Sequence, residues 1–310
     1  MAIFTEQSYR ARGKLLLTGE YFVLDGALSL ALPTRLGQQL HLRPHTDRGS
    51  LHWRSENPDG SPWFQGHFDL GDGQILQASD QPTAQRLRQI LQAIRRQNPG
   101  FLSPGQGVLA TSRLEFPRHW GLGSSSTLIA TLAQWAGVDP YQLLADTFGG
   151  SGYDIACATA TGPIYYQRTT TGPQSRASPF DPPFREHLFW VYLEQKQNSR
   201  EGIARYRAMV EKKTPLIDKI SAWSREIPNC ESLDDFAALL DAHEALVAEA
   251  LRLEPVKKSR FADFWGSVKS LGAWGGDFVL LTSDRTREET QRYCNEKGFT
   301  TFFSYDELLL

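Results

Sequence analysis

The sequence has little cysteine, no long apolar run and almost no net charge. Its three cysteines, Cys157, Cys230 and Cys294, lie far apart and are odd in number, so they predict neither a disulfide framework nor a CxxC metal site. No apolar run approaches the roughly 20 residues of a membrane helix. The first residues also lack the ordered basic, apolar and cleavage regions of a secretory signal. We therefore expect a soluble, cytoplasmic protein with no membrane partner.

The charge balance excludes a further class of protein. Lys and Arg number 33 and Asp and Glu number 35, so the formal net charge is -2. This balance argues against a nucleic-acid coat, and we expect no nucleic-acid partner. With 40% hydrophobic and 11% aromatic residues among 310, the chain has ample material for a buried core. Its length is about twice that of a typical domain, which predicts two lobes.

Hydrophobic periodicity predicts a mixed α+β protein. Within residues 83–96, apolar side chains recur at helical spacing and end before Asn98-Pro99-Gly100, which is typical of an amphipathic helix. Further strands are predicted at 9–18, around 40–53, and at 108–116, 188–193 and 278–281, and further helices at 127–136, 201–226 and 234–252. The polar, Pro-rich stretch 169–183 is the best linker candidate. We therefore expect lobes at 1–172 and 173–310.

A glycine-rich segment, Gly121-Leu122-Gly123-Ser124-Ser125-Ser126, lies between a predicted strand and a predicted helix. Glycines let a backbone approach an anion closely, and a helix N-terminus offers unpaired N–H groups with a partial positive charge. Taken alone, the segment is equally consistent with a tight turn capped by serine. Ser126 replaces the third glycine of the dinucleotide-binding fingerprint, and no GxxxxGK[ST] sequence occurs.

Two more segments make the pattern specific. Gly13 to Gly26 matches G-K-x-x-L-x-G-E-[HY]-x-V-x-x-G, Pro117 to Ser126 matches P-x-x-x-G-L-G-S-S-[AS], and 272–276 reads Gly-Ala-Trp-Gly-Gly. With these three motifs in order, the chain resembles the GHMP kinase superfamily, which includes galactokinase, homoserine kinase, mevalonate kinase and phosphomevalonate kinase. The run Gly152-Tyr153-Asp154-Ile155-Ala156 resembles a branch of the superfamily named GYDIA after those letters.

The resemblance implies a two-lobed α+β fold with the active site in the cleft. The N-terminal lobe would be ribosomal-S5-like and bind ATP, and the C-terminal lobe would be ferredoxin-like. ATP and Mg²⁺ are the implied cofactors: Gly121 to Ser126 would hold the phosphates and Ser125 would bind the metal. Asp146 is the nearest candidate for a second metal ligand.

The resemblance also implies the catalytic pair. Phosphoryl transfer depends mainly on positioning and electrostatic stabilisation. Asp154 would orient or deprotonate the acceptor, and Lys14 would stabilise the acceptor's anion. Taken without the other motifs, Asp154 is more typical of a helix N-cap, and Lys14 of a solvated lysine at a strand edge.

Mevalonate kinases typically have GEH in the first motif and HGxPSGxD around the aspartate, whereas this chain has Gly19-Glu20-Tyr21 and Gly149-Gly150-Ser151-Gly152-Tyr153-Asp154. These departures resemble phosphomevalonate kinases and so favour a phosphomevalonate-type acceptor over mevalonate. The residues implied to bind the small-molecule substrate are Glu20, Tyr21, Ser151, Gly152, Ser199, Arg200, Gly275 and Gly276. A phosphorylated acceptor carries roughly two more negative charges than mevalonate, so Lys196 and Arg200 are attractive partners for it. A charged turn with Ser199 as N-cap is equally consistent with this segment. Trp274, at a position that is usually glycine, either narrows the pocket or is a core or lid aromatic.

Three classes of function remain open. The leading one is an ATP- and Mg²⁺-dependent kinase for phosphomevalonate or mevalonate. The second is an enzyme resembling mevalonate diphosphate decarboxylase, and the third is a non-catalytic binding protein that keeps the fold. Lys14, Ser125 and Asp154 argue against the third, whereas Trp274 leaves room for it. His243-Glu244 lacks the second histidine of HExxH and predicts no zinc site.

Overall fold

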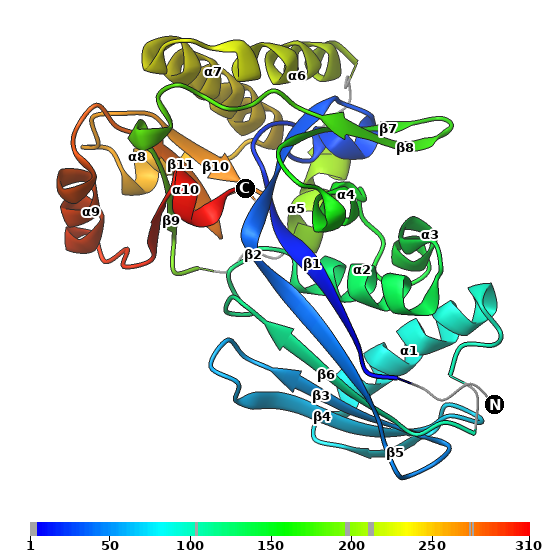
Figure 1. The fold of residues 1–310 in the computed structure, drawn as a ribbon. Coiled ribbons are helices and arrows are strands. Elements are labelled where there is room, and N and C mark those ends of the chain that lie inside the picture. Colours follow the sequence, from blue (N-terminus) through cyan, green and yellow to red (C-terminus); the bar gives the residue numbers. More distant parts are fainter. Residues whose placement is uncertain (1–4, 103–104, 196–198, 210–213, 273, 275) are drawn as a thin grey trace. The chain divides into compact units, whose positions relative to one another are not determined.

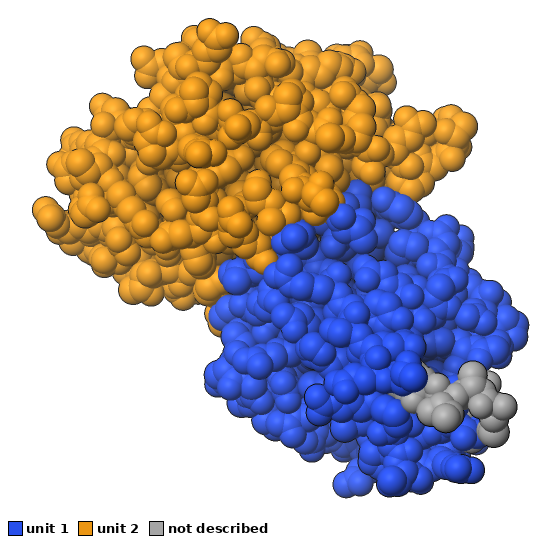
Figure 2. All heavy atoms as spheres, in the orientation of Figure 1, with its two compact units in different colours: residues 1–13, 36–118, 122–159 blue, residues 14–35, 119–121, 160–310 orange. Residues whose placement is uncertain are grey.

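The chain forms two compact units, shown in different colours in Figure 2. The computed structural model describes residues 5–102, 105–195, 199–209, 214–272, 274 and 276–310. Unit 1 comprises residues 1–13, 36–118 and 122–159, and unit 2 comprises 14–35, 119–121 and 160–310. Strands β1 (Gln7–Leu16) and β2 (Ser29–Pro44) each contribute residues to both units, so neither unit is one continuous stretch of sequence.

Unit 1 is a twisted sheet covered by helices. Its other elements are β3 (Ser50–Glu56), β4 (Pro62–Asp69), β5 (Ile75–Ala78), α1 (Gln81–Gln97), β6 (Val108–Leu114), α2 (Ser124–Ala136), α3 (Pro140–Ala145) and α4 (Tyr153–Thr159). The strand order is β5-β4-β3-β6-β2, and only the β3–β6 pairing is parallel. Helices α1 and α2 lie on one face of this sheet (Figure 1). The core there includes Trp53, Phe64 and Ile90.

Helix α1 confirms the periodicity argument. Asp80 caps it by accepting a hydrogen bond from Thr83 N–H at 2.8 Å, and Pro82 occupies the first turn. Leu87, Ile90, Leu91 and Ile94 are all buried against the sheet. Full burial of each such side chain stabilises the fold by about 1.5–3 kcal/mol. The helix ends at Asn98, as predicted.

Unit 2 is built on a four-stranded antiparallel sheet. The strands of this sheet are β9 (Leu188–Tyr192), β10 (Val268–Leu271), β11 (Phe278–Thr282) and β12 (Phe302–Ser304). Unit 2 also contains β7 (Ile164–Thr169) and β8 (Gly172–Ala177), which pair with each other, and β7 pairs with the Ser29–Ala31 part of β2. Its helices are α5 (Ser199–Met209), α6 (Thr214–Glu226), α7 (Leu233–Leu251), α8 (Val256–Arg260), α9 (Arg287–Glu296) and α10 (Tyr305–Leu308), with short 3₁₀ turns at Phe22–Asp25, Arg185–His187 and Ile227–Asn229. The order β10-β11-β9-β12 places β9 and β11 centrally.

Two sequence expectations need correction. The single helix predicted at 201–226 is two helices, α5 and α6, and Pro215 lies in the first turn of α6. The predicted linker, 169–183, contains strand β8, which pairs with β7. The Thr-rich sequence closes this hairpin, because Thr169 Oγ1 donates to the Gly172 carbonyl at 2.8 Å. The lobe boundary at residue 172 stays a prediction. No helix among the described residues combines the length and apolar composition needed to cross a membrane.

Candidate active site

The N-terminus of α2 is open toward an anion. Its N-cap is Gly123, held in the left-handed region at φ +93°, and no side chain caps the helix. The first turn contains no acidic residue. The first N–H groups of a helix lack intrahelical acceptors and carry a partial positive charge. Leu122 is fully buried, so this residue can contribute only its backbone to the loop.

The three serines of the loop differ in their contacts. Ser126 is buried, and its hydroxyl donates to the Gly123 carbonyl at 2.8 Å. Thr127 extends this internal bonding by donating to Gln38 Oε1 at 2.6 Å. Ser124 is half-buried and Ser125 is exposed, and neither hydroxyl makes a hydrogen bond within the described chain. Ser126 therefore fixes the loop, whereas Ser124 and Ser125 offer hydroxyls to a ligand.

Asp154 lies in the first turn of α4, after a run of left-handed glycines. Gly149, Gly150 and Gly152 have φ of +67°, +117° and +89°. Residues other than glycine rarely adopt such positive φ values. The Asp154 carboxylate accepts from the Ile155 N–H at 3.1 Å. Helix α4 packs on α2 through Ala158 and Ala130. Unit 1 therefore packs together two helices that both begin at predicted site residues.

The surroundings of Asp154 include a half-buried phenol, that of Tyr141. Burial raises the pKa of Tyr141 to about 12, with smaller contributions from Cys157 and Asp154. Tyr141 therefore stays protonated near the Asp154 carboxylate. Ser151, half-buried, and Gly152, buried, lead into this helix turn.

Asp146, the predicted second metal ligand, ends α3. Its carboxylate accepts from Gln142 Nε2 at 2.8 Å and lies 3.7 Å from an Arg96 nitrogen. These partners occupy the carboxylate without burying it. A role for Asp146 in metal binding stays a prediction.

Unit 2 contributes Lys14 and the start of the phosphate loop. The Lys14 ammonium donates to the Gly121 carbonyl at 2.8 Å. Gly121 has φ +71°, and a Cβ at this position would lie 2.3 Å from a carboxylate oxygen of Asp277. Any other residue at 121 would both strain the backbone and collide with Asp277. The structure therefore requires glycine here and ties Lys14 to the loop.

Tyr21 and Trp274 form one buried contact in unit 2. The Tyr21 hydroxyl accepts from the Trp274 N–H at 3.1 Å, and both rings belong to an apolar cluster with Phe22 and Tyr206. Trp274 is therefore a core aromatic, one of the alternatives that the sequence left open. Tyr21 has φ +62°, which is unusual for a tyrosine and is held by these contacts.

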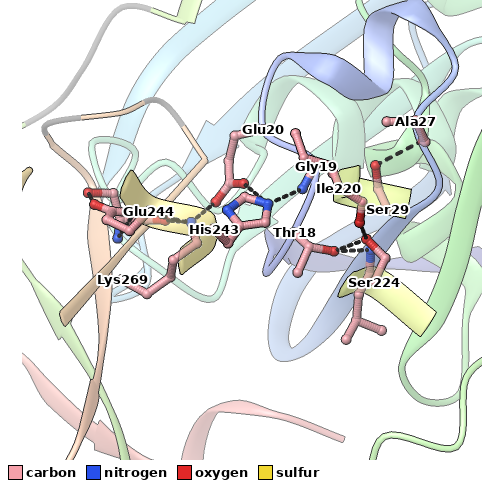
Figure 3. A network of polar contacts seen from close by, with 12 residues as sticks. Thr18, Gly19, Glu20, Ala27, Ser29, Ile220, Ser224, His243, Glu244 and Lys269 are labelled. Atoms are coloured by element: carbon pink, nitrogen blue, oxygen red, sulfur yellow. Dashed lines mark hydrogen bonds and ion pairs between the residues drawn. The ribbon is translucent and has the colours of Figure 1, made fainter. Parts of the chain in front are cut away.

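Glu20 belongs to a buried ion cluster, which we define as Glu20, His243, Glu244 and Lys269. In Figure 3, Lys269 and His243 point toward the Glu20 carboxylate. The Lys269 ammonium donates to Glu20 Oε1 and lies 3.4 Å from Glu244 Oε2. His243 Nε2 lies 3.5 Å from Glu20 Oε2. The side chains of Glu20, His243 and Lys269 have no exposed surface.

Burial sets the protonation of this cluster. His243 Nε2 accepts from the Gly19 N–H at 3.1 Å, and burial lowers the pKa of His243 well below its usual value. The imidazole is therefore neutral. Burial also raises the pKa of Glu20 to about 7, against the opposing pull of Lys269, and it raises the pKa of Glu244. Lys269 is the single fixed cation of the cluster, and it faces two carboxylates.

The geometry corrects the expectation for Glu20. A substrate-binding carboxylate needs an accessible oxygen, whereas Glu20 is 1% exposed and pairs with Lys269. The structure therefore gives Glu20 an internal role, fixing the segment from Gly19 to Tyr21. The sequence analysis did not identify the partners of Glu20. One indication was available in α7, because His243 and Glu244 lie on the same buried face of this helix as Phe236, Leu240 and Val247.

The remaining predicted residues are placed only in part. Ser199 and Arg200 begin α5, but their side chains are outside the described set. Lys196 and Gly275 also lie outside the described residues. Gly276 is buried in the bend before β11.

Comparison with known proteins identifies solved structures that share this fold. No protein-family model matches the sequence, and no curated protein matches it. Among solved structures, the chain is similar to the mevalonate kinase of Methanococcus jannaschii, with TM-score 0.72, 15% identity, and coverage of 97% of this chain and 98% of that one. It is equally similar to Streptococcus pneumoniae phosphomevalonate kinase in complex with phosphomevalonate and AMPPNP, with TM-score 0.72, 13% identity, and coverage of 96% and 99%.

Staphylococcus aureus mevalonate diphosphate decarboxylase is a more distant match, with TM-score 0.59, 11% identity, and coverage of 98% and 94%. These alignments run over nearly the whole length of each chain, which confirms the two-lobed α+β architecture expected from the motifs. The chain therefore has the GHMP kinase fold.

Proposed function

We propose that the protein is an ATP-dependent phosphotransferase that phosphorylates a small acceptor of the mevalonate type, either phosphomevalonate or mevalonate. The observation that carries the proposal is the N-terminus of α2, which has no side-chain cap, a half-buried Ser124, an exposed Ser125 and no acid in its first turn. Such a helix end binds phosphate, and it lies in the motif by which the chain resembles GHMP kinases.

The donor set fits the phosphates of ATP. Backbone N–H groups from Gly123 to Ser126 and the hydroxyl of Ser124 would hold phosphate oxygens. Ser125 and Asp146 offer hydroxyl and carboxylate oxygens, the ligand types that Mg²⁺ prefers, and Mg²⁺ is commonly shared with substrate phosphates. When bound, the ion would neutralise charge on the phosphates. The left-handed Gly123 lets the loop approach them without a side chain in the way.

Two side chains would act on the acceptor. Asp154 would accept a hydrogen bond from the acceptor hydroxyl and hold its oxygen in line for attack, receiving the proton as the bond forms. Lys14 would place a positive charge against the oxygen as it loses that proton. Its hydrogen bond to the Gly121 carbonyl limits the positions that the ammonium can take.

The identity of the acceptor, mevalonate or phosphomevalonate, is a separate part of the proposal. The mevalonate kinase and the phosphomevalonate kinase have the same TM-score to this chain, so the fold does not distinguish the two acceptors. The departures from the mevalonate kinase motifs at Tyr21 and Gly150 favour phosphomevalonate. Arg200 would then pair with the acceptor's phosphate.

A product-resolved assay tests the function. The purified chain, ATP and Mg²⁺ are incubated with mevalonate, phosphomevalonate, mevalonate diphosphate, homoserine or galactose, while ADP release and the phosphorus NMR spectrum of the products are followed. We expect acceptor-dependent ADP release with a phosphorylated mevalonate-type product. Asp154→Asn lowers kcat by about 10²-fold or more. Asp139→Asn is the matched control, since Asp139 caps α3 in the same unit.

Four outcomes would contradict the proposal. ADP release that ignores the acceptor, or that persists in Asp154→Asn, excludes the assigned mechanism. Release of inorganic phosphate and CO₂ from mevalonate diphosphate would replace the kinase by a decarboxylase. Turnover of homoserine or galactose alone would keep the kinase and overturn the acceptor.

A further inference from the structure

Three histidines and one aspartate meet on unit 1, and none of them belongs to the proposed phosphotransfer site. We name this group, His45, Asp47, His52 and His67, the histidine cluster. His45 and Asp47 lie in the turn between β2 and β3, His52 lies on β3, and His67 lies on β4. His52 and His67 are direct cross-strand partners, so their side chains share one face of the sheet. That face is opposite the core, because the neighbouring Leu51 and Trp53 are buried.

The distances within the histidine cluster are those of a metal site. Asp47 Oδ2 lies 3.0 Å from His52 Nε2 and 3.2 Å from His67 Nε2. Ligand atoms of His45, Asp47 and His52 all lie within 4.8 Å of one another. Two ligand atoms about 2.0–2.1 Å from a tetrahedral zinc are separated by about 3.3–3.4 Å. The cluster therefore needs only small side-chain movements to surround one ion.

The histidine rings are gathered without an evident packing reason. Ring centroids are 4.0 Å apart both between His45 and His52 and between His52 and His67. His67 Nε2 is buried and faces Asp47, yet it lacks the geometry of a hydrogen bond to any described residue. A buried nitrogen without a hydrogen-bond partner destabilises the folded state. A shared ion between His67 and Asp47 would satisfy that nitrogen.

The turn that carries two of the ligands is held by its backbone. The His45 N–H donates to the Gly107 carbonyl at 2.8 Å, and the Gly49 N–H donates to the Gln106 carbonyl at 2.8 Å. The Asp47 carboxylate lies within hydrogen-bonding distance of His52 Nε2, at 3.0 Å. The ligands are therefore in place before an ion arrives, and this reduces the cost of ordering them on binding.

We propose that the histidine cluster binds one divalent transition-metal ion of the zinc class, with His45, Asp47, His52 and His67 as its ligands. Imidazole nitrogens favour Zn²⁺, Co²⁺, Ni²⁺ and Cu²⁺ over Mg²⁺, so this site is chemically distinct from that of the phosphotransfer cofactor. The ion would take the place of the hydrogen bond between His52 Nε2 and Asp47, and it would bind imidazole nitrogens that carry no proton. The ion would join the β2–β3 turn to β4.

Metal titration of the untagged, metal-free full chain tests the site. Calorimetry with Zn²⁺ gives the stoichiometry and affinity, and Co²⁺ reports tetrahedral geometry through its visible absorption. We expect one equivalent to bind, a rise in unfolding temperature, and intense Co²⁺ bands. Since even outer-shell partners of a metal site change affinity about 10–100-fold, His52→Ala and His67→Ala each weaken binding at least tenfold. His41→Ala, a histidine of β2 outside the cluster, leaves binding unchanged.

Each remaining outcome overturns the site. No saturable binding of Zn²⁺ or Co²⁺ excludes it directly. Binding that is equally strong in the His52→Ala, His67→Ala double variant places the ion elsewhere, as does binding lost in His41→Ala. His52→Gln and His67→Gln give the same comparison in variants that keep side-chain volume, and circular dichroism without metal verifies that they fold.

Discussion

The buried ion cluster and the histidine cluster use the same two chemical groups, imidazole and carboxylate, in opposite surroundings. In the buried ion cluster the Glu20 and His243 side chains have no exposed surface. In the histidine cluster the side chains of His52 and Asp47 are 31% and 49% exposed. Burial raises the pKa of Glu20 to about 7, whereas hydrogen bonds lower the pKa of Asp47.

This difference separates an internal support from a binding site. In the buried ion cluster, Glu20 Oε1 accepts from Lys269 and His243 Nε2 accepts from the Gly19 N–H, and burial decides which groups are charged. In the histidine cluster, the carboxylate is ionised and nitrogen atoms converge on one of its oxygens from a solvated surface. Substitutions in the first cluster should therefore change stability, and substitutions in the second should change ligand binding.

The largest expected effect is on Lys269. Lys269→Met leaves Glu20 and Glu244 buried together without a cation, and breaking a buried pair in this way costs about 3–5 kcal/mol in the free energy of unfolding. Lys258→Met, at an exposed lysine of α8, should stay within about 0.5 kcal/mol of the wild type. Urea unfolding measures both. Equal losses in the two variants would contradict the assigned role of the buried cluster.

The second largest effect distinguishes the two clusters by the stability that each loses when one histidine is replaced by alanine. His243→Ala opens a cavity and leaves the Gly19 N–H without its acceptor, which should cost about 2–4 kcal/mol. His52→Ala in the metal-free protein should cost no more than about 0.5 kcal/mol, because the site is on the surface. Thermal unfolding of both proteins without metal gives the comparison. A larger loss in His52→Ala would reverse the distinction drawn between the clusters.

The pH dependence of Glu20→Gln should be smaller and has a definite sign. Because the folded-state pKa of Glu20 is raised to about 7, the folded protein keeps this proton between about pH 5 and 7, where the unfolded chain has released it. The contribution of Glu20 to the free energy of unfolding of the wild type is therefore lost as the pH rises through that window. The stability of Glu20→Gln relative to wild type should rise over the same window and level off above about pH 8.

Urea unfolding from about pH 5 to 8 measures this difference between Glu20→Gln and wild type. His243, whose pKa is lowered, contributes with the opposite sign below its ordinary pKa, but it is present in both proteins. Glu254→Gln, at an exposed carboxylate after α7, should give a flat difference. A difference that falls with rising pH would exclude the protonated state of Glu20.

The smallest expected effect concerns salt. Near pH 5.5, where histidines are ordinarily charged, Asp47→Asn should lower the unfolding temperature slightly at about 0.1 M NaCl. The loss should shrink toward about 1 M, as the Debye length falls from about 10 to 3 Å. The loss in Glu244→Gln should not change with salt, because its carboxylate is shielded from solvent. Equal salt dependence in the two variants would contradict the difference in exposure.

Local signals in the sequence predicted local structure well. Helix α1 followed from its apolar spacing and its Asn-Pro-Gly stop, whereas its Asp80 cap was found only in the structure. The hairpin of β7 and β8 was missed, because β8 is short, polar and exposed, and its pairing with β7 rather than its own pattern makes it a strand. The split of 201–226 into two helices had one local signal, Pro215, which breaks a helix unless it lies in the first turn.

The candidate site was predictable where a motif is contiguous. The phosphate loop and the turn before Asp154 lie in unbroken segments whose glycines adopt the left-handed conformations their positions demand. The role of Glu20 was not predictable in this way, because its partners lie on α7 and β10. The histidine cluster needs the register that pairs His52 with His67, and neither residue marks that pairing locally.

The interleaved order of the two units has a consequence for synthesis of the chain. Unit 1 is complete once residue 159 has been made, whereas the 14–35 segment of unit 2 must await later residues. Lys269 follows Glu20 by 249 positions, a delay of about 12–50 s at common translation rates of about 5–20 residues per second. We expect the Glu20 carboxylate to remain without its Lys269 partner on the ribosome until that residue has been made.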